Sequence, residues 1–245
     1  MKPIALMLLL SALISTTAGA EDFDHNHQLF NQLLGDVVHV QDFQSRVDYP
    51  RLIKQRTTLN LYLESVSSVS KPTFDTFTPD QQLAFLINAY NGNQLRQVID
   101  NYPIKSIKDV GSFFSSPWSK EFFTLFGQPT SLDFVEHQLI RQLFKEPRIH
   151  FAVNCASISC PPLQNEAYIA GKLDQQLESA AENFLRDTEA NYLKGDTLHV
   201  SKIFDWYEED FPGGVLQFVA RYREDLPAAG LKLKYSDYNW NLNKR

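Results

Sequence analysis

The stretch from Thr78 to Pro103 constrains the fold most, because it has the pattern of one long helix. Thr78 is a favourable N-cap residue, and Pro79 suits the first helical turn because its φ is fixed near the helical value. Apolar residues then recur at helical spacing, at Leu83, Leu86, Ile87, Tyr90, Val98 and Ile99. Pro103 ends the run. The sequence therefore predicts a helix that begins after Thr78 and ends before Pro103.

Other helices are predicted where apolar residues keep the same period between breakers. The clearest lie at about residues 23–34, 50–65 and 132–145. For the last of these, Thr130 and Asp133 form a predicted N-terminal cap pair, and Pro147 follows its end. Two further helices are expected near residues 172–187 and 214–222.

Strand-like segments are few and short. A hairpin is predicted from residues 122–126 and 129–132 around a Gly127-Gln128 turn. Residues 148–153 alternate polar and apolar side chains, which predicts a strand that leads into Cys155. Short strands are also expected at residues 197–201 and 231–235. This inventory predicts an α+β fold, a helix-rich single domain with a small, mostly antiparallel sheet.

The first twenty residues have the pattern of a secretory signal peptide. Lys2 supplies a positive start, residues 4–14 are almost wholly apolar, and Ala18-Gly19-Ala20 fits a cleavage site. The apolar run is too short to cross a bilayer, and no run of about twenty apolar residues follows it. We therefore expect a periplasmic or secreted protein, one globular domain over residues 21–245, and no stable membrane span after cleavage.

The charge balance argues against nucleic acid as a partner. The chain has 23 Lys and Arg against 29 Asp and Glu, and no block of basic residues. Binding to nucleic acid depends on clustered cations that neutralise phosphates. With 43% hydrophobic residues, the chain has ample material for a sizeable core. We expect a small-molecule or peptide-like substrate, of unknown identity, as the partner.

Glu136 and His137 are the first candidates for a functional site. On the predicted helix 132–145, Glu136 falls within an apolar face formed by Val135, Leu139, Leu143 and Phe144. A carboxylate in such surroundings needs a partner. Two interpretations stay open for it, a structural ion pair with Arg96 or Arg141 and a role in a site. His137 lies at the edge of the same face and is open to the same two interpretations.

Cys155 is the candidate nucleophile. It follows the predicted strand 148–153 and opens a run of small residues, whose backbone N–H groups could stabilise an oxyanion. A thiol needs a base or a positive neighbour to react at neutral pH. His150 lies five residues earlier, and this odd spacing places it on the opposite face of a regular strand. We therefore prefer His137 as the base, with Glu136 as the supporting carboxylate.

The cysteines allow two other interpretations. A disulfide between Cys155 and Cys160 suits an oxidising compartment. A metal site built from both cysteines and two histidines is at the loose edge of zinc spacings, so we expect no metal and no cofactor. Asn88 and Asn91 share one face of the helix after Thr78. They either hold a neighbouring loop or orient a catalytic group.

Several segments resemble the domain-of-unknown-function 547 family. They are residues 85–91 (FLINAYN), 133–137 (DFVEH) and 148–162 (RIHFAVNCASISCPP), and residues 47–49 and 204–207 fit as well. The resemblance covers roughly residues 45 to 215. It implies a Glu-His pair and one cysteine at Glu136, His137 and Cys155, and no established activity. It also implies that Cys160 can be serine in other members, which weakens the case for an obligatory disulfide.

The leading hypothesis is a thiol hydrolase or acyltransferase that acts on an amide or ester. Cys155 is the nucleophile, His137 the base, Glu136 the supporting carboxylate, and Asn88 an orienting or oxyanion group. The set is similar to transglutaminase-like sites, although the histidine precedes the cysteine, the reverse of the papain-like order. The alternative is a non-enzymatic binding or scaffold domain with a buried Glu-His-Asn network and a disulfide between Cys155 and Cys160.

Overall fold

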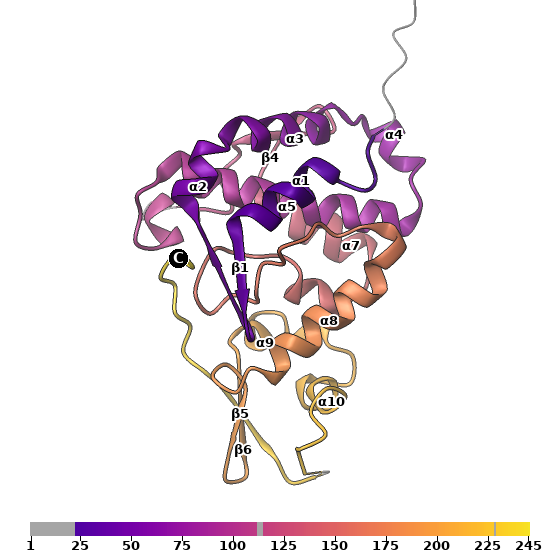
Figure 1. Ribbon diagram of the computed structural model, residues 1–245. Helices are drawn as coiled ribbons and strands as arrows, with labels where there is room; N and C mark the ends of the chain where they lie inside the picture. Colours follow the sequence, from indigo (N-terminus) through magenta and orange to yellow (C-terminus); the bar gives the residue numbers. More distant parts are fainter. Residues whose placement is uncertain (1–22, 112–114, 228) are drawn as a thin grey trace, which may run out of the picture.

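Helix α5, Pro79–Asn101, is the longest described helix of the computed structural model, and it begins where the sequence predicts (Figure 1). Thr78 Oγ1 accepts a hydrogen bond from Gln81 N at 3.3 Å, and the Gln81 side chain accepts one from Thr78 N at 2.9 Å. This reciprocal capping box satisfies two of the N–H groups that a helix start leaves unpaired. From Leu83 to Ile99 nearly every residue is buried, so α5 is enclosed by other elements on all sides.

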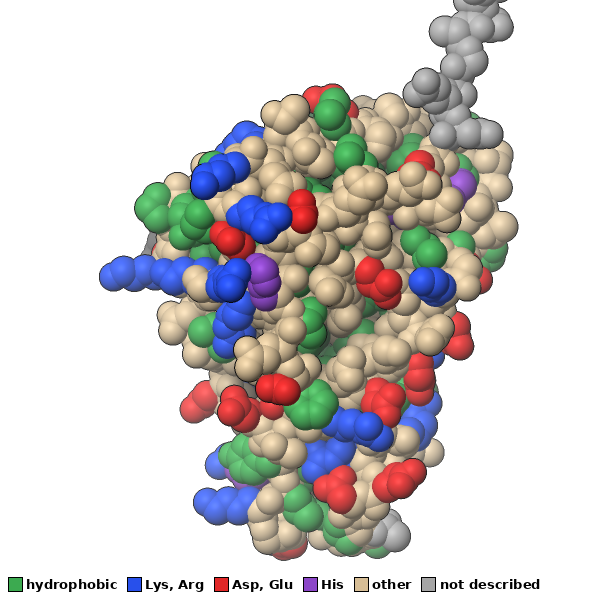
Figure 2. All heavy atoms as spheres, in the orientation of Figure 1, with side chains coloured by type: hydrophobic (Ala, Val, Ile, Leu, Met, Phe, Trp, Pro, Cys, Tyr) green, Lys and Arg blue, Asp and Glu red, His purple; other side chains and the backbone are tan. Residues whose placement is uncertain are grey.

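The structure describes residues 23–111, 115–227 and 229–245. The predicted signal peptide, residues 1–20, lies outside them. Within these ranges, no helix is both long enough and apolar enough to cross a membrane. Figure 2 shows acidic and basic side chains interspersed over one face of the molecule.

The N-terminal helices pack along α5, with boundaries that differ from the prediction. Helix α1 spans Gln28–Val37, because Asp24 accepts hydrogen bonds from Asn26 N and Gln28 N and holds the preceding residues in a turn. The helix expected at 50–65 is two helices, α2 (Tyr49–Lys54) and α3 (Arg56–Ser68). Asp48 caps α2, and the short helix α4, Lys71–Asp75, follows α3.

Within the described residues, the strands form three small sheets. Strands β1 (Val38–Gln41) and β2 (Gln44–Val47) are antiparallel, as are β3 (Phe123–Leu125) and β4 (Gln128–Thr130). The third sheet pairs β5 (Tyr192–Lys194) with β6 (Thr197–Val200), and β6 with β7 (Lys232–Tyr235) in parallel. The expected α+β, helix-rich architecture with little, mostly antiparallel sheet is confirmed, although the strands are distributed over separate sheets.

Two hydrophobic clusters form the core. The first surrounds α5, and the second lies among the helices of the C-terminal half, α8 (Leu173–Arg186), α9 (Ile203–Trp206) and α10 (Val215–Ala220). Helix α8 contributes Leu173 and Leu177 to the first cluster and Ala181 and Leu185 to the second. One helix therefore ties the two clusters together, as Figure 1 shows for α8 between the upper and lower elements.

The helix predicted at 132–145 is not regular. It consists of α6 (Leu132–Phe134), a π-helical segment (Val135–Ile140) and α7 (Arg141–Leu143). The prediction of a cap by Thr130 and Asp133 is wrong, because Ser131 Oγ accepts the hydrogen bond from Phe134 N. The wider π turn rotates the residues after it relative to a regular helix. Leu143, predicted to face the core, is therefore 54% exposed.

The strand predicted at 148–153 is also wrong. Pro147–Phe151 is a 3₁₀ helix. The described part of the chain has three other short ones, Ile107–Val110, Ala170–Lys172 and Glu208–Asp210. Glu146 caps it by accepting a hydrogen bond from Arg148 N, and proline suits its first position. Arg148 then pairs with Asp174 and Glu178, which fastens the turn to α8.

His27 makes stability depend on pH. The ring is buried, its Nδ1 lies 2.9 Å from Tyr62 Oη, and burial lowers its pKa from 6.5 to about 4. The unfolded chain therefore binds this proton at higher pH than the folded one. We predict that the free energy of unfolding falls by about 3 kcal/mol as pH drops from 6.5 to 4. Urea titrations of the wild type and His27→Gln across this range test it, and parallel losses in the two proteins would contradict it.

Asn91 is predicted to be a stability determinant. Its Nδ2 donates to Ala152 O and its Oδ1 accepts from Asn154 N, both at 2.9 Å and both buried. Asn91→Ala leaves these two groups unpaired and should lower the free energy of unfolding by about 2–4 kcal/mol. Asn101→Ala on the same helix is the matched control, since it removes one hydrogen bond to Gln97 O near the surface. Equal urea midpoints for the two variants would refute the assignment.

Candidate functional site

A pocket of about 390 Å³ collects residues that are far apart in the chain. Its size is at the small end of the range for ligand sites. Six of its lining residues are aromatic and six are ionisable or thiol side chains. The lining comprises Tyr90, Lys108, Trp118, Asp133, Glu136, His150, Val153, Cys155, Cys160, Pro161, Ile203, Trp206, Tyr207, Tyr238 and Trp240. We refer to it as the thiol pocket.

The loop that carries Cys155, residues 154–161, is held from within. Asn154 Oδ1 accepts a hydrogen bond from Ala156 N at 2.9 Å, and Asn154 Nδ2 donates to Pro161 O at 2.8 Å. Ala156 has φ 61°, a left-handed conformation that is unfavourable for a residue with a Cβ. The Asn154 side chain thus links the two ends of the loop, and Asn91 joins the loop to α5.

The C-terminal tail, residues 236–245, pairs with the same loop. Asn241 O accepts from Ile158 N at 2.8 Å, and Ala156 O accepts from Asn243 N at 3.1 Å. These main-chain bonds bring Tyr238 into the thiol pocket. This contribution was not predicted from the sequence, because the tail has no periodic pattern beyond the short strand predicted before it.

The sulfur of Cys155 is surrounded by hydrogen-bond donors. Ser157 Oγ lies 3.0 Å and Tyr238 Oη 3.2 Å from Cys155 Sγ. Burial raises the pKa of Cys155, but hydrogen bonds from Cys160, Ser157 and Tyr238 outweigh it, and the net pKa lies below that of an ordinary thiol. Burial and the neighbouring Cys155 sulfur raise the pKa of Cys160. Cys155 is therefore the more acidic thiol of the two.

Both cysteines are free thiols. Cys160 Sγ accepts a hydrogen bond from Cys155 N at 2.7 Å, so the two residues are adjacent but do not form the disulfide of the alternative interpretation. In the described part of the chain, no group of three or more His, Cys, Asp and Glu side chains is placed to hold a metal ion.

His150 is the imidazole that lines the thiol pocket. Its side chain is 1% exposed, and its Nε2 lies 2.7 Å from Asp210 Oδ2. Burial would raise the pKa of Asp210, but hydrogen bonds from His150 and Arg141 hold it well below its usual range. The ionised carboxylate therefore accepts the Nε2–H of His150 and leaves Nδ1 as the other functional atom. Within the described residues Nδ1 has no hydrogen-bond partner.

Glu136 is buried, as predicted, but its partner differs from both candidates. Its Oε1 lies 4.0 Å from His150 Nδ1. Arg96 pairs with Asp100, and Arg141 pairs with Glu209 and Asp210, so the first of the two interpretations, an ion pair of Glu136 with either arginine, is not formed.

Tyrosines surround the same carboxylate. Burial raises the pKa of Tyr207 above its ordinary value, and the neighbouring Glu136 raises it further. The pKa of Tyr90 is raised for the same two reasons. The ring of Tyr207 also stacks on His150, with centroids 4.0 Å apart. Glu136, His150 and the two tyrosines thus form one contiguous group.

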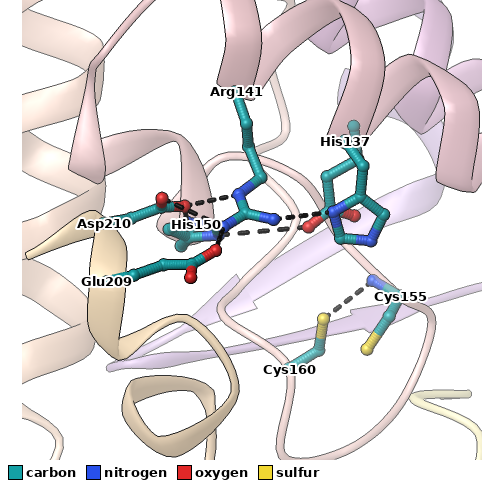
Figure 3. Close-up of polar contacts among 8 residues, drawn as sticks. His137, Arg141, His150, Cys155, Cys160, Glu209 and Asp210 are labelled. Carbon is teal, nitrogen blue, oxygen red and sulfur yellow. Dashed lines mark hydrogen bonds and ion pairs between the residues drawn. The ribbon is translucent and has the colours of Figure 1, made fainter.

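His137 belongs to a different network (Figure 3). Its Nδ1 lies 3.0 Å from Arg141 Nη1. A guanidinium only donates hydrogen bonds, so Nδ1 is the acceptor and the ring proton is on Nε2. His137 does not line the thiol pocket, and among the described residues no hydrogen bond joins its ring to Cys155. The expected pairing of His137 with Cys155 is therefore not present as a direct contact.

Asn88 also lies apart from the thiol pocket. It is fully buried, its Nδ2 donates to Tyr168 O at 2.7 Å, and its Oδ1 accepts from Tyr168 N at 3.0 Å. Both ends of the amide are occupied by main chain. Of the four predicted site residues, the structure thus places Cys155 and Glu136 in one pocket, and His137 and Asn88 outside it.

Most of the other pocket residues were not predicted from the sequence as functional, and Tyr207, Trp206 and Tyr238 are three of them. Tyr207 and Trp206 belong to an aromatic, acidic run that resembled core packing, and Tyr238 lies in the C-terminal tail. Asp210, which orients His150, ends the same acidic run. The only signal in the sequence was an acidic residue after an aromatic cluster. The sequence did not indicate its partner, His150, which is sixty residues away in the chain.

Comparison with known families gives one match. Residues 74–185 match the family described as protein of unknown function, DUF547. The match confirms the expected resemblance, over a shorter stretch than residues 45 to 215, and it contains Glu136, His137, His150 and Cys155. Neither the curated proteins nor the solved structures gave a match.

The hydroxyl donors around Cys155 yield a test by alkylation. Tyr238→Phe and Ser157→Ala each remove a donor that stabilises the thiolate, so each should move the pH midpoint of iodoacetamide alkylation upward. At pH 7 the rate at Cys155 should fall roughly threefold to tenfold, the effect of losing one typical hydrogen bond. Peptide mapping assigns the alkylated cysteine. Tyr235→Phe, which leaves the pocket intact, serves as control, and unchanged midpoints in both test variants would refute the mechanism.

Proposed function

Since residues 74–185 match the DUF547 family, whose description assigns no reaction, we propose a function from the pocket itself. The protein is a thiol hydrolase or acyltransferase that acts on an amide or an ester. One observation carries the proposal: the acidic thiol of Cys155 opens into the same pocket as the buried Glu136 and His150. Clefts that hold a perturbed nucleophile beside acid–base groups are typical of active sites.

The reaction proceeds through a thioester. The Cys155 thiolate attacks the carbonyl carbon of the substrate, a C–S bond forms, and the carbonyl π electrons move to oxygen. When the carbonyl re-forms, the C–N or C–O bond breaks, and the leaving group takes a proton from Glu136 and His150, which act together as one proton-holding pair. Water then attacks the thioester carbon and gives a proton to that pair. The C–S bond breaks, which releases the acid and restores the thiolate.

His150 replaces His137 as the imidazole of this mechanism. Asp210 accepts the Nε2–H of His150, which leaves Nδ1 facing Glu136 inside the pocket. This is the carboxylate-oriented imidazole that general acid–base catalysis uses. His137 carries its ring proton on Nε2 because Arg141 occupies Nδ1, so it is not a base in this arrangement. It serves to position Arg141, which in turn pairs with Asp210.

A binding domain without catalysis is the second candidate. The observation in its favour is that no hydrogen bond joins Cys155 Sγ to an imidazole among the described residues. The same network of Glu136, His150 and Asp210 would then stabilise the fold around a ligand pocket. The export expected from the first twenty residues is compatible with either candidate.

Acylation of Cys155 is the first test. Wild-type protein mixed with p-nitrophenyl acetate should release a rapid burst of about one equivalent of nitrophenolate before slower turnover, and carry an acetyl group on Cys155, identified by peptide mass. Cys155→Ser should slow this step by about a thousandfold or more, as expected when a nucleophile is removed. Cys160→Ser is the matched control and should remain reactive. Acetylation on another residue, or none at all, would refute the hydrolase.

The choice of imidazole is tested with paired variants. His150→Asn should slow acylation and deacylation by about a hundredfold, the lower range for a general acid–base group. His137→Asn should lower the rate by less than about fivefold. His137 acts only by positioning Arg141, and losing that contact should cost about as much as losing one exposed ion pair. Both variants should retain the far-UV spectrum of the wild type. The reverse order of effects would assign the base to His137 instead.

A further inference from the structure

All three tryptophans of the chain line the thiol pocket. Trp118, Trp206 and Trp240 come from three separate segments, and Tyr238 adds a fourth ring beside them. We call these four side chains the aromatic wall. Trp206 is 42% exposed. Its neighbours in α9 belong to the second hydrophobic cluster, but its own side chain does not. Half-exposed aromatic side chains that gather around a concavity mark a binding surface.

The aromatic wall is continuous. The ring centroids of Trp206 and Trp240 are 5.4 Å apart with planes 27° from parallel, and Tyr238 lies 4.4 Å from Trp240. The ring centroids of Trp118 and Trp240 are 5.6 Å apart. Such mutual stacking immobilises the rings, so a ligand that lies on them loses little side-chain entropy. A flat ring of the ligand can stack on this surface with offset geometry.

Lys108 supplies the charge at the rim. Its Nζ lies 4.0 Å over the Trp240 ring, and among the described residues it has no ion-pair partner. An ammonium held over a pocket wall can pair with an anionic group of a ligand. Inside the pocket the carboxylates Asp133 and Glu136 repel an anion, so the negative group of the ligand belongs at the rim.

We propose that the substrate carries a six-membered ring, aromatic or sugar, that presents one flat face and bears an anionic substituent. The ring lies on the aromatic wall, the anionic group pairs with Lys108, and the scissile carbonyl reaches Cys155. This inference deepens the proposed function and rests on it for the place of the carbonyl. The pocket volume of about 390 Å³ suits a ligand of this size. Aromatic walls also bind cations, but here Lys108 already occupies the cation position over Trp240.

Intrinsic fluorescence tests binding without catalysis, because every tryptophan of the chain reports on this pocket. Cys155→Ser protein is titrated with 3-phenylpropionate and its neutral amide, and separately with glucuronate and glucose. We expect a saturable change with an anionic ring, with affinity about two- to fivefold above its neutral counterpart, as for one exposed ion pair. Binding in the aryl arm identifies an aromatic substrate, and binding in the uronate arm a sugar acid.

Variants separate the two contacts. Lys108→Met in the Cys155→Ser background should reduce the affinity for the anionic ring to that of its neutral counterpart. Lys105→Met, an exposed lysine outside the pocket, is the matched control and should have no effect. Trp206→Leu should weaken binding of charged and neutral rings alike by about tenfold, the loss of one stacked ring contact with its buried area.

Three outcomes would overturn the inference: no saturable change with either anionic ring, equal affinity for charged and neutral rings, or tighter binding of phenethylammonium. The binding experiment and the acylation test can fail independently of each other. Ring binding without acylation of Cys155 refutes the thiol hydrolase and leaves the binding site, whereas acylation without ring binding refutes only the substrate class.

Discussion

The side-chain amide of Asn91 holds the centre of this protein together. It joins the enclosed helix α5 to Ala152 and Asn154, the residues that lead into the loop around Cys155. Both hydrogen bonds are buried, where an unpaired main-chain group is costly. The loop can therefore adopt the strained conformation at Ala156 and still present one geometry of the sulfur. The C-terminal tail completes the same arrangement from the other side through main-chain bonds.

The charges of the site form one chain of contacts from the surface to the pocket. Arg141 pairs with Glu209 and Asp210, Asp210 orients His150, and His150 faces Glu136. A buried carboxylate and a buried imidazole are tolerated here because each has an oppositely charged or polar neighbour. The π-helical segment Val135–Ile140 sets the direction of Glu136 and His137, so an irregular turn decides which of the two enters the pocket.

The pKa of Cys155 is lowered by hydrogen-bond donors and not by the imidazole that the sequence led us to expect. Hydroxyls of Ser157 and Tyr238 and the second thiol of Cys160 donate to the Cys155 sulfur, while burial opposes ionisation. Hydrogen bonding to the charged form lowers a pKa as an adjacent cation would. The imidazole is then left to move protons of the substrate and water in the proposed mechanism. Because hydrogen-bond donors stabilise the thiolate, the imidazole need not contact the sulfur, and the described contacts of Cys155 include no histidine.

The fold class, the central helix after Thr78, the hairpin β3–β4, the resemblance to the DUF547 family and the burial of Glu136 were all predictable from the sequence. Each of these depends on local pattern: a cap, a period of apolar residues, a turn, or an ordered motif. The strand predicted at 148–153 failed because alternating side chains also occur when a proline-initiated 3₁₀ turn packs its apolar residues on two cores. That error placed His150 on the wrong side of Cys155 and favoured His137.

By itself, then, the sequence determined the central helix and the β3–β4 hairpin, and it identified Cys155 and Glu136 as residues that can carry chemistry. Only the tertiary structure decided which of them meet. His150 and Asp210 are sixty residues apart and Cys155 and Tyr238 eighty-three, and such contacts arise from packing that no local period encodes. A thiol acquires its acidity, and an imidazole its tautomer, from neighbours that only the folded chain brings within hydrogen-bond distance.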